Sequence, residues 1–170
     1  MTEKIFTNVI ILRIFVYIMK GGEMVDDLEM KIVRVLNENS RKSFREIAKE
    51  IGSSAPAVIN KIKRLEEQGA IKGYIPILDP EYFGYNLVAV VAIRISHGKL
   101  IETQEKIAED PRVFAIYDVT GEWDSIVIAR FKSREDLNNF VKSVLSQKYV
   151  DRTITNVVLN VVKEEQRLSI

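Results

Sequence analysis

Residues 43–74 read SFREIAKEIGSSAPAVINKIKRLEEQGAIKGY, and this stretch decides the fold of the amino-terminal half. Ser43 and Glu46 have the spacing of a capping box, which marks the start of a helix. Ser54 can cap a second helix, and Pro56 lies in its first turn, where the missing N–H of proline costs little. Two short helices joined by a tight turn predict a helix-turn-helix, a DNA-reading module.

The second predicted helix has an apolar side, on which residues recur at helical spacing from Val58 to Leu65. Small and basic groups on its other side suit the major groove, because they permit close approach and can contact bases or phosphates. Between Arg41 and Arg64 there are seven basic and two acidic residues, although the whole chain carries only +1, so positive charge is focused here. A charged outer helix face is more often merely solvated, and that alternative stays open. The expected DNA-contacting residues are Lys42, Arg45, Ser53, Ser54, Ala55, Pro56, Ala57, Asn60, Lys61, Lys63 and Arg64.

Composition limits the other possibilities. With 170 residues, of which 46% are hydrophobic and 29% charged, the chain can form one globular domain or two small ones. The absence of cysteine excludes disulfides, thiolate metal sites and thiol nucleophiles, and it is compatible with a reducing cytoplasm. A single histidine leaves little material for a histidine-based metal site. We therefore expect no metal and no cofactor.

The first 23 residues differ in character from the rest. Their apolar run from Ile5 to Met19 is shorter than the ~18–20 residues of a membrane span and is interrupted by Arg13, and no signal-peptidase site follows. The codons implied by residues 20–23 can spell a purine-rich ribosome-binding sequence ahead of Met24. We expect Met24 to be the initiator, to be checked by the intact mass of the natively expressed protein. An extra helix or strand covering an apolar dimer surface is the open alternative.

From Met24 onward, two domains are expected. Residues 24–75 form the helix-turn-helix domain, whose first helix begins near Asp26 and Asp27. The stretch from Ile71 to Leu78 alternates enough to predict a strand that serves as a wing, and residues 76–86 are expected to form a linker strand.

Residues 87–165 show the order strand, helix, strand, strand, helix, strand, which predicts a ferredoxin-like βαββαβ domain with both helices on one sheet face. The fold class is thus α+β, with residues 166–170 as a tail. In the first helix, Ile101 and Ile107 are expected to point inward. The other sheet face is then apolar and uncovered, which predicts self-association. The expected strands and helices are 87–96, 99–109, 113–120, 123–131, a helix from Ser133, and 153–162.

Several segments together resemble the Lrp/AsnC family, the feast/famine transcription regulators of bacteria and archaea, in its archaeal type. These segments are DDLEMKIVRVLNENSR from residue 26, REIAKEIGSS from 45, VINKIKRLEEQGAIKGY from 58, DPEYFGY from 79 and VTGEWDSIV from 119. The resemblance implies a cytoplasmic DNA-binding regulator whose second domain is of the RAM or ACT-like type. It also implies homodimers joined through linker strands and sheets, commonly assembled into octamers as tetramers of dimers. Asn60 and Lys61 depart from the family's usual arginine, so an unusual base preference is expected.

The resemblance further implies an amino-acid effector bound between dimers near the turn at Gly121. Glycine allows backbone groups to approach the effector's carboxylate, an aspartate can pair with its ammonium, and threonine hydroxyls can satisfy its remaining polar atoms. Because Asp118 and Glu122 are acidic, lysine or arginine is the expected effector. The alternative is that Gly121 only makes a hairpin turn and Trp123 only packs. The implied site comprises Asp118, Thr120, Gly121, Glu122, Trp123, Asp124, Thr153 and Thr155.

Two other functions remain open. Relatives of the family decarboxylate sirohaem, but that tetrapyrrole chemistry uses histidines and this chain has only His97, which is more typical of a turn. The chain also lacks the G-x-S-x-G, H-E-x-x-H and Walker motifs of other enzymes. An amino-acid-sensing assembly module that has lost DNA binding is the second alternative. We expect a regulator without catalytic residues.

Overall fold

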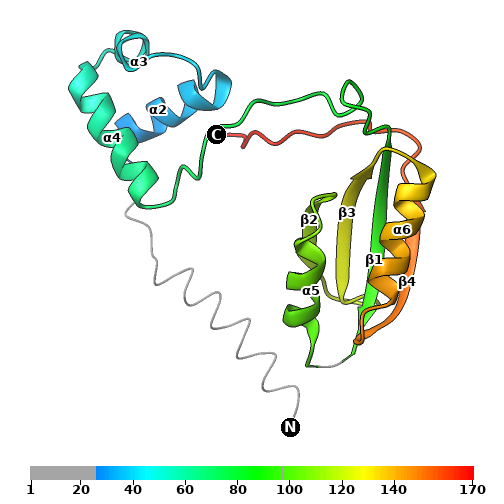
Figure 1. Cartoon of the computed structure of the whole chain (residues 1–170). Helices are drawn as coiled ribbons and strands as arrows, with labels where there is room; N and C mark the ends of the chain where they lie inside the picture. Colours follow the sequence, from blue (N-terminus) through cyan, green and yellow to red (C-terminus); the bar gives the residue numbers. More distant parts are fainter. Residues whose placement is uncertain (1–25, 97) are drawn as a thin grey trace. The chain divides into compact units, whose positions relative to one another are not determined.

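The computed structural model describes residues 26–96 and 98–170, which divide into two compact units (Figure 1). Among the described residues, one unit contains 26–76 together with 166–170, and the other contains 77–96 and 98–165. The predicted tail is therefore grouped with the first unit, where the Asn37 side chain donates a hydrogen bond to the Leu168 carbonyl at 2.8 Å. The predictions for residues 1–23 and for His97 lie outside the described residues.

Helices of the first unit begin at the capping residues that the sequence indicates. Ser43 forms the predicted capping box with Glu46, and Asp26 forms another with Glu29. The Ser54 hydroxyl accepts a hydrogen bond from the Ala57 N–H at 3.4 Å. The helices are α2 (Asp27–Glu38), α3 (Phe44–Ile51) and α4 (Ala55–Glu67).

The apolar sides of these three helices form one small core. The predicted stripe of α4 is confirmed, since Val58, Ile62 and Leu65 are all buried. A left-handed backbone at Gly52, with φ of 67°, ends α3 and lets the chain turn into α4. The buried cluster consists of Ile32, Val35, Ile47, Ala48, Val58 and Ile62.

Neither the predicted wing strand from Ile71 to Leu78 nor the predicted linker strand over residues 76–86 forms in this chain. The stretch from Ile71 to Leu78 is not a strand, and no described segment forms a ladder of backbone hydrogen bonds with it. Ile75, Ile77 and Leu78 are exposed, so nothing covers the alternating apolar side chains. A strand needs a partner edge for its backbone groups, and no such edge lies beside this segment in the described residues.

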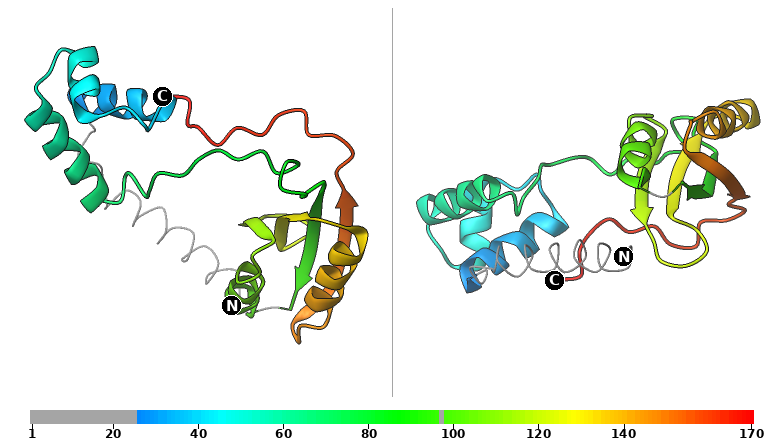
Figure 2. Two further views of the ribbon diagram at one scale, coloured as in Figure 1. Left: turned by 45° about the horizontal axis from the view of Figure 1, so that its top comes forward. Right: turned by 90° about the horizontal axis from the view of Figure 1, so that it is seen from below.

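The second unit is the predicted βαββαβ domain. Its four strands are antiparallel to their neighbours and lie in the order β2-β3-β1-β4, with α5 and α6 on one face (Figures 1 and 2). This is the ferredoxin-like arrangement. The elements are β1 (Leu87–Ile95), α5 (Leu100–Ala108), β2 (Val113–Asp118), β3 (Ser125–Phe131), α6 (Arg134–Leu145) and β4 (Val150–Val157).

Alternate residues of the central strands β1 and β3 point toward the two helices and form the main core. Phe131 of β3 and Phe140 of α6 lie at its centre, with ring centroids 5.3 Å apart. The prediction for Ile107 is confirmed, but Ile101 is 59% exposed. Thr103 is buried instead, because its hydroxyl donates to the Lys99 carbonyl at 2.7 Å and so satisfies its polar group.

Strand ends also differ from the predicted ranges. β3 begins two residues after Trp123, β2 ends at Asp118, and β4 ends at Val157 rather than Val162. The β1–β4 ladder has Ala89 and Val157 as its last pair, and the Val158 N–H still donates to the Val88 carbonyl at 2.9 Å just beyond it.

The sheet face opposite the helices is apolar, as predicted. One row across all four strands consists of Tyr117, Ile126, Ala92 and Ile154, which are direct cross-strand partners. Tyr117 and Ile154, at the two edges, are exposed, as is Phe114. Within residues 26–96 and 98–170, no helix has the length and apolar character needed to span a membrane.

Candidate DNA-reading and effector sites

The outward side of α4 carries a polar and apolar mixture. Asn60 is exposed, and the Lys63 side chain is 72% exposed with only a 3.7 Å ion pair to Glu67 on the same helix. Pro56 is exposed one turn earlier. These three predicted residues are accessible to a DNA groove.

Lys61 and Arg64 both have acidic partners at the start of α2, although the Arg64 side chain is still 40% exposed. The Lys61 ammonium donates to the Asp26 carboxylate and, at 3.4 Å, to Glu29 Oε1. Arg64 Nε lies 3.4 Å from the same Glu29 oxygen. Glu29 is 1% exposed, so burying its carboxylate requires nearby positive charge.

The contact between Asp26 and Lys61 shifts the pKa of both groups. The hydrogen bond from Lys61 holds the pKa of Asp26 below its ordinary value of 3.8. In turn, the hydrogen bond to Asp26 raises the pKa of Lys61 above 10.5. Both groups therefore remain charged at neutral pH, and the pair joins the start of α2 to the middle of α4.

The other predicted DNA contacts have mixed surroundings. Lys42 is paired with Glu50 at 2.6 Å, whereas Arg45 is exposed on α3. Ser54 caps α4 and is exposed. Ser53, Ala55 and Ala57 are only partly exposed, and Ala55 packs against the core.

The prediction omitted Ile59. This apolar residue is 42% exposed beside Asn60 and can contact a thymine methyl group. Helical geometry could have indicated its exposure, because Ile59 follows Val58 and therefore lies about 100° around the helix from the buried stripe.

In the second unit, the turn after β2 is held by internal bonds of Asp124. Its carboxylate accepts a hydrogen bond from the Ile95 N–H at 2.8 Å and contacts Arg94 Nη1 at 3.4 Å. Its own N–H donates to the Ile93 carbonyl at 3.0 Å. Gly121 has φ of 116°, a backbone conformation that side chains disfavour. Asp124 therefore fixes the turn to β1, a role the prediction did not include.

Arginines balance the acidic character expected for this turn. Arg152 donates to Glu122 Oε1 at 2.8 Å and lies over the Trp123 ring at 4.7 Å. Arg94 donates to the Glu122 carbonyl at 2.6 Å. The premise for a cationic effector rested on Asp118 and Glu122, and it omitted Arg94 and Arg152, of which Arg152 pairs with Glu122. Strand alternation could have indicated them, since the two are direct partners in the β1–β4 ladder.

The remaining predicted effector residues are not brought together in one chain. Asp118 is on β2 and Thr153 on β4, the two edges of the sheet, with Ser125 and Ile93 between them in the same row. Three strand spacings amount to roughly 14 Å, too far for one amino acid to contact both. Thr155 lies on the same edge as Thr153, whereas exposed Thr120 follows Asp118.

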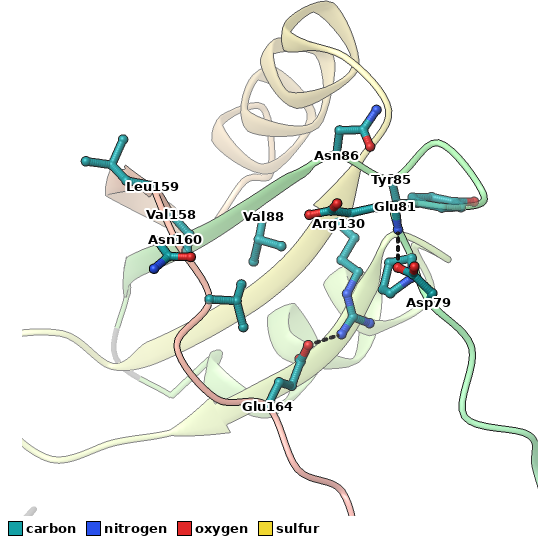
Figure 3. Close-up of a pocket in the computed structure, with 12 residues that line it drawn as sticks. Asp79, Glu81, Tyr85, Asn86, Val88, Arg130, Val158, Leu159, Asn160 and Glu164 are labelled. Carbon is teal, nitrogen blue, oxygen red and sulfur yellow. Dashed lines mark hydrogen bonds and ion pairs between the residues drawn. The ribbon is translucent and has the colours of Figure 1, made fainter.

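A cleft of about 250 Å³ lies elsewhere in the second unit, beside the open sheet face (Figure 3). Arg130 extends into it, stacked 3.8 Å from the Phe114 ring centroid and paired with Glu164 at 2.6 Å. None of the predicted effector residues lines this cleft. Its lining residues are Asp79, Pro80, Glu81, Tyr85, Asn86, Val88, Arg130, Val158, Leu159, Asn160, Val161 and Glu164. Among described residues there is no cluster of three or more metal-ligating side chains.

Comparison with known proteins places both units in one family. Residues 25–66 match the AsnC-type helix-turn-helix domain, and residues 88–168 match the Lrp/AsnC ligand binding domain. The chain belongs to the Lrp/AsnC family. An uncharacterised HTH-type transcriptional regulator of the archaeon Pyrococcus abyssi is 50% identical over 145 residues, covering 85% of this chain and 99% of the relative.

Two solved structures in this family contain L-methionine. One is a transcriptional regulator from Neisseria meningitidis, with 26% identity and a TM-score of 0.78 over 85% of this chain and 96% of its own. The other is a feast or famine regulatory protein from M. tuberculosis, with 28% identity and a TM-score of 0.75 over 85% and 98%. The protein is therefore a transcriptional regulator of Lrp/AsnC type with a helix-turn-helix and a ligand-binding domain.

Proposed function

We propose that this Lrp/AsnC regulator binds specific double-stranded DNA with α4 in the major groove, and that an amino acid controls its assembly and DNA affinity. The observation that carries the DNA-binding role is the outward side of α4, where Ile59, Asn60 and Lys63 are exposed together. An amide, a methyl-bearing side chain and a cation can read bases and hold phosphates. Such a regulator acts on the chromosome, so we place it in the cytoplasm.

The proposed effector site requires two copies of the chain. Asp118 and Thr153 lie at opposite edges of one sheet, so an amino acid that contacts both types of residue must lie between subunits. An effector at such a junction can favour one arrangement of dimers, and the coupling to DNA binding is typically ~1–3 kcal/mol.

We propose an effector with an uncharged side chain rather than lysine or arginine. Glu122 and Asp124 already have arginine partners, so the turn offers a cationic side chain little unbalanced negative charge. The two methionine-bound relatives support a neutral amino acid. Thermal unfolding with methionine, leucine, glutamine, lysine and arginine tests this choice. Greater stabilisation by lysine or arginine than by methionine would restore the original expectation.

The open sheet face and the linker are the proposed dimer surfaces. The row through Tyr117 and Ile154 is apolar, and the alternating side chains at Ile75 and Ile77 lack a partner strand among the described residues. A second copy would bury both surfaces, and further assembly of four dimers would give an octamer. Native mass spectrometry measures the assembly, and Ile154→Arg is expected to reduce it to smaller species.

We propose no enzymatic activity. Electrophoretic mobility shift on the protein's own promoter separates the functions, because a regulator of this type is expected to bind there. A bound tetrapyrrole chromophore in purified protein would instead support a sirohaem decarboxylase. Effector-dependent assembly without any DNA shift would support an amino-acid-sensing module.

A further inference from the structure

We propose that Lys61 is a positioning residue for DNA recognition: it orients α4 through Asp26 and Glu29 and does not neutralise a phosphate. The inference rests on the proposed DNA-binding function. It assigns sequence discrimination to the geometry of a charged contact between α2 and α4, behind the surface that faces DNA.

The contact has three features of a fixed element. Glu29 is almost fully buried, and its Oε1 is shared by Lys61 and Arg64, each at 3.4 Å. Its Oε2 accepts from the Asp26 N–H at 3.1 Å, so the same carboxylate completes the capping box of α2. Asp26 Oδ1 accepts a hydrogen bond from the Glu29 N–H, and Asp26 Oδ2 accepts one from the Lys61 ammonium. The start of α2 therefore contacts Lys61 and Arg64, which lie three residues apart on α4.

Lys63 offers a matched comparison on the same helix. The two lysines differ by two positions, which places them on different sides of α4. The Lys61 side chain is 25% exposed and has two acidic partners, the N-cap Asp26 and Glu29 of α2. The Lys63 side chain is 72% exposed, and its one ion-pair partner, at 3.7 Å, is on its own helix. Only Lys63 has the freedom to follow a phosphate.

Salt dependence of DNA binding distinguishes these two roles. Each phosphate neutralised by a lysine contributes about 0.9 to the slope of log K against log salt. The probes are a duplex selected by the wild-type protein from random sequences and a scrambled duplex of the same composition. Lys63→Ala is expected to reduce the slope by about 0.9 for each copy bound and to weaken both duplexes alike.

Lys61→Met, which keeps most of the apolar stem, is expected to leave the slope unchanged. It should lower the ratio of selected to scrambled affinity by about tenfold, the size expected for one displaced base contact. A loss of slope equal to that of Lys63→Ala would overturn the positioning role.

The double variant Asp26→Asn with Glu29→Gln provides a second test that keeps both capping side chains, because asparagine and glutamine also cap helices. It releases Lys61, so the slope should become steeper while the affinity ratio falls as in Lys61→Met. An unchanged ratio would contradict the proposal even if Lys61→Met fails to fold. Failure of the wild-type protein to bind any duplex would contradict the proposed function itself.

Discussion

In the helix-turn-helix unit, the N-cap Asp26 and Glu29 of α2 pair with basic side chains of α4. In the second unit, an arginine of β1 and one of β4 pair with acids of the turn after β2. The difference lies in what remains exposed. The first unit keeps exposed cationic side chains at Arg45 and Lys63, whereas Glu122 and Asp124 of the turn both have arginine partners. Charge near a recognised motif therefore says little about a ligand until the partners of that charge are known.

The largest test asks whether the two units are stabilised independently. Phe131→Ala removes a fully buried ring and is expected to cost the second unit about 3–5 kcal/mol. Trp123, the only tryptophan, reports that unit by fluorescence during denaturant unfolding. Ile47→Ala in the first core is the counterpart, and it should leave the fluorescence transition in place. If both variants shift one common transition equally, the units unfold together.

Asp124→Ala comes next in size. It leaves the Ile95 N–H without its acceptor and Arg94 without a carboxylate, which should cost about 1.5–3 kcal/mol. The exposed Asp118→Ala is the control and should cost far less. Loss of the amino-acid response with unchanged stability would show that Asp124 contacts the effector directly, as the family resemblance first implied.

Asn60→Ala tests the exposed surface of the first unit. We expect specific DNA affinity to fall by ~1–2 kcal/mol, because an amide that can pair with adenine is removed without disturbing a buried group. Asn138→Ala, on an exposed position of α6, is the matched control. Equal affinities of the two variants for a selected duplex would remove Asn60 from the reading surface.

The smallest expected effect concerns pH. Because the folded pKa of Asp26 is depressed, its contribution to stability is present above pH 3.8 and is lost as the pH falls through the folded pKa. The raised pKa of Lys61 has the opposite sense, so its contribution is present below pH 10.5 and is lost as the pH rises through the folded pKa. Lys61→Met should make the thermal unfolding midpoint less dependent on pH in both the acidic and the alkaline range. An unaltered profile would mean that the pair does not stabilise the fold.

Local signals made much of this fold predictable. Capping serines at 43, 54 and 133 each accept the hydrogen bond expected from the residue three positions later. Alternation in β1 and β3 identified the core of the second unit. These features depend on neighbours within one turn or one strand, which a sequence pattern records directly.

The site was less predictable because its decisive contacts are not local. Lys61 meets Asp26 across 35 positions, and Arg152 meets Glu122 across 30. Helical spacing could place Lys61 on the flank of α4 but could not show that α2 passes there. The wing was predicted as a strand for the same reason. Alternating apolar residues indicate which way side chains point, but they do not show whether a neighbouring strand is there to pair with.

The strand order also bears on how the protein is made. The three described helices of the first unit follow one another from Asp27 to Glu67, but β1 cannot complete its pairing until β4, the last of the four sheet strands, has left the ribosome. At ~5–20 residues per second that delay lasts several seconds. During synthesis, the module that reads DNA can therefore fold well before the domain that receives the effector.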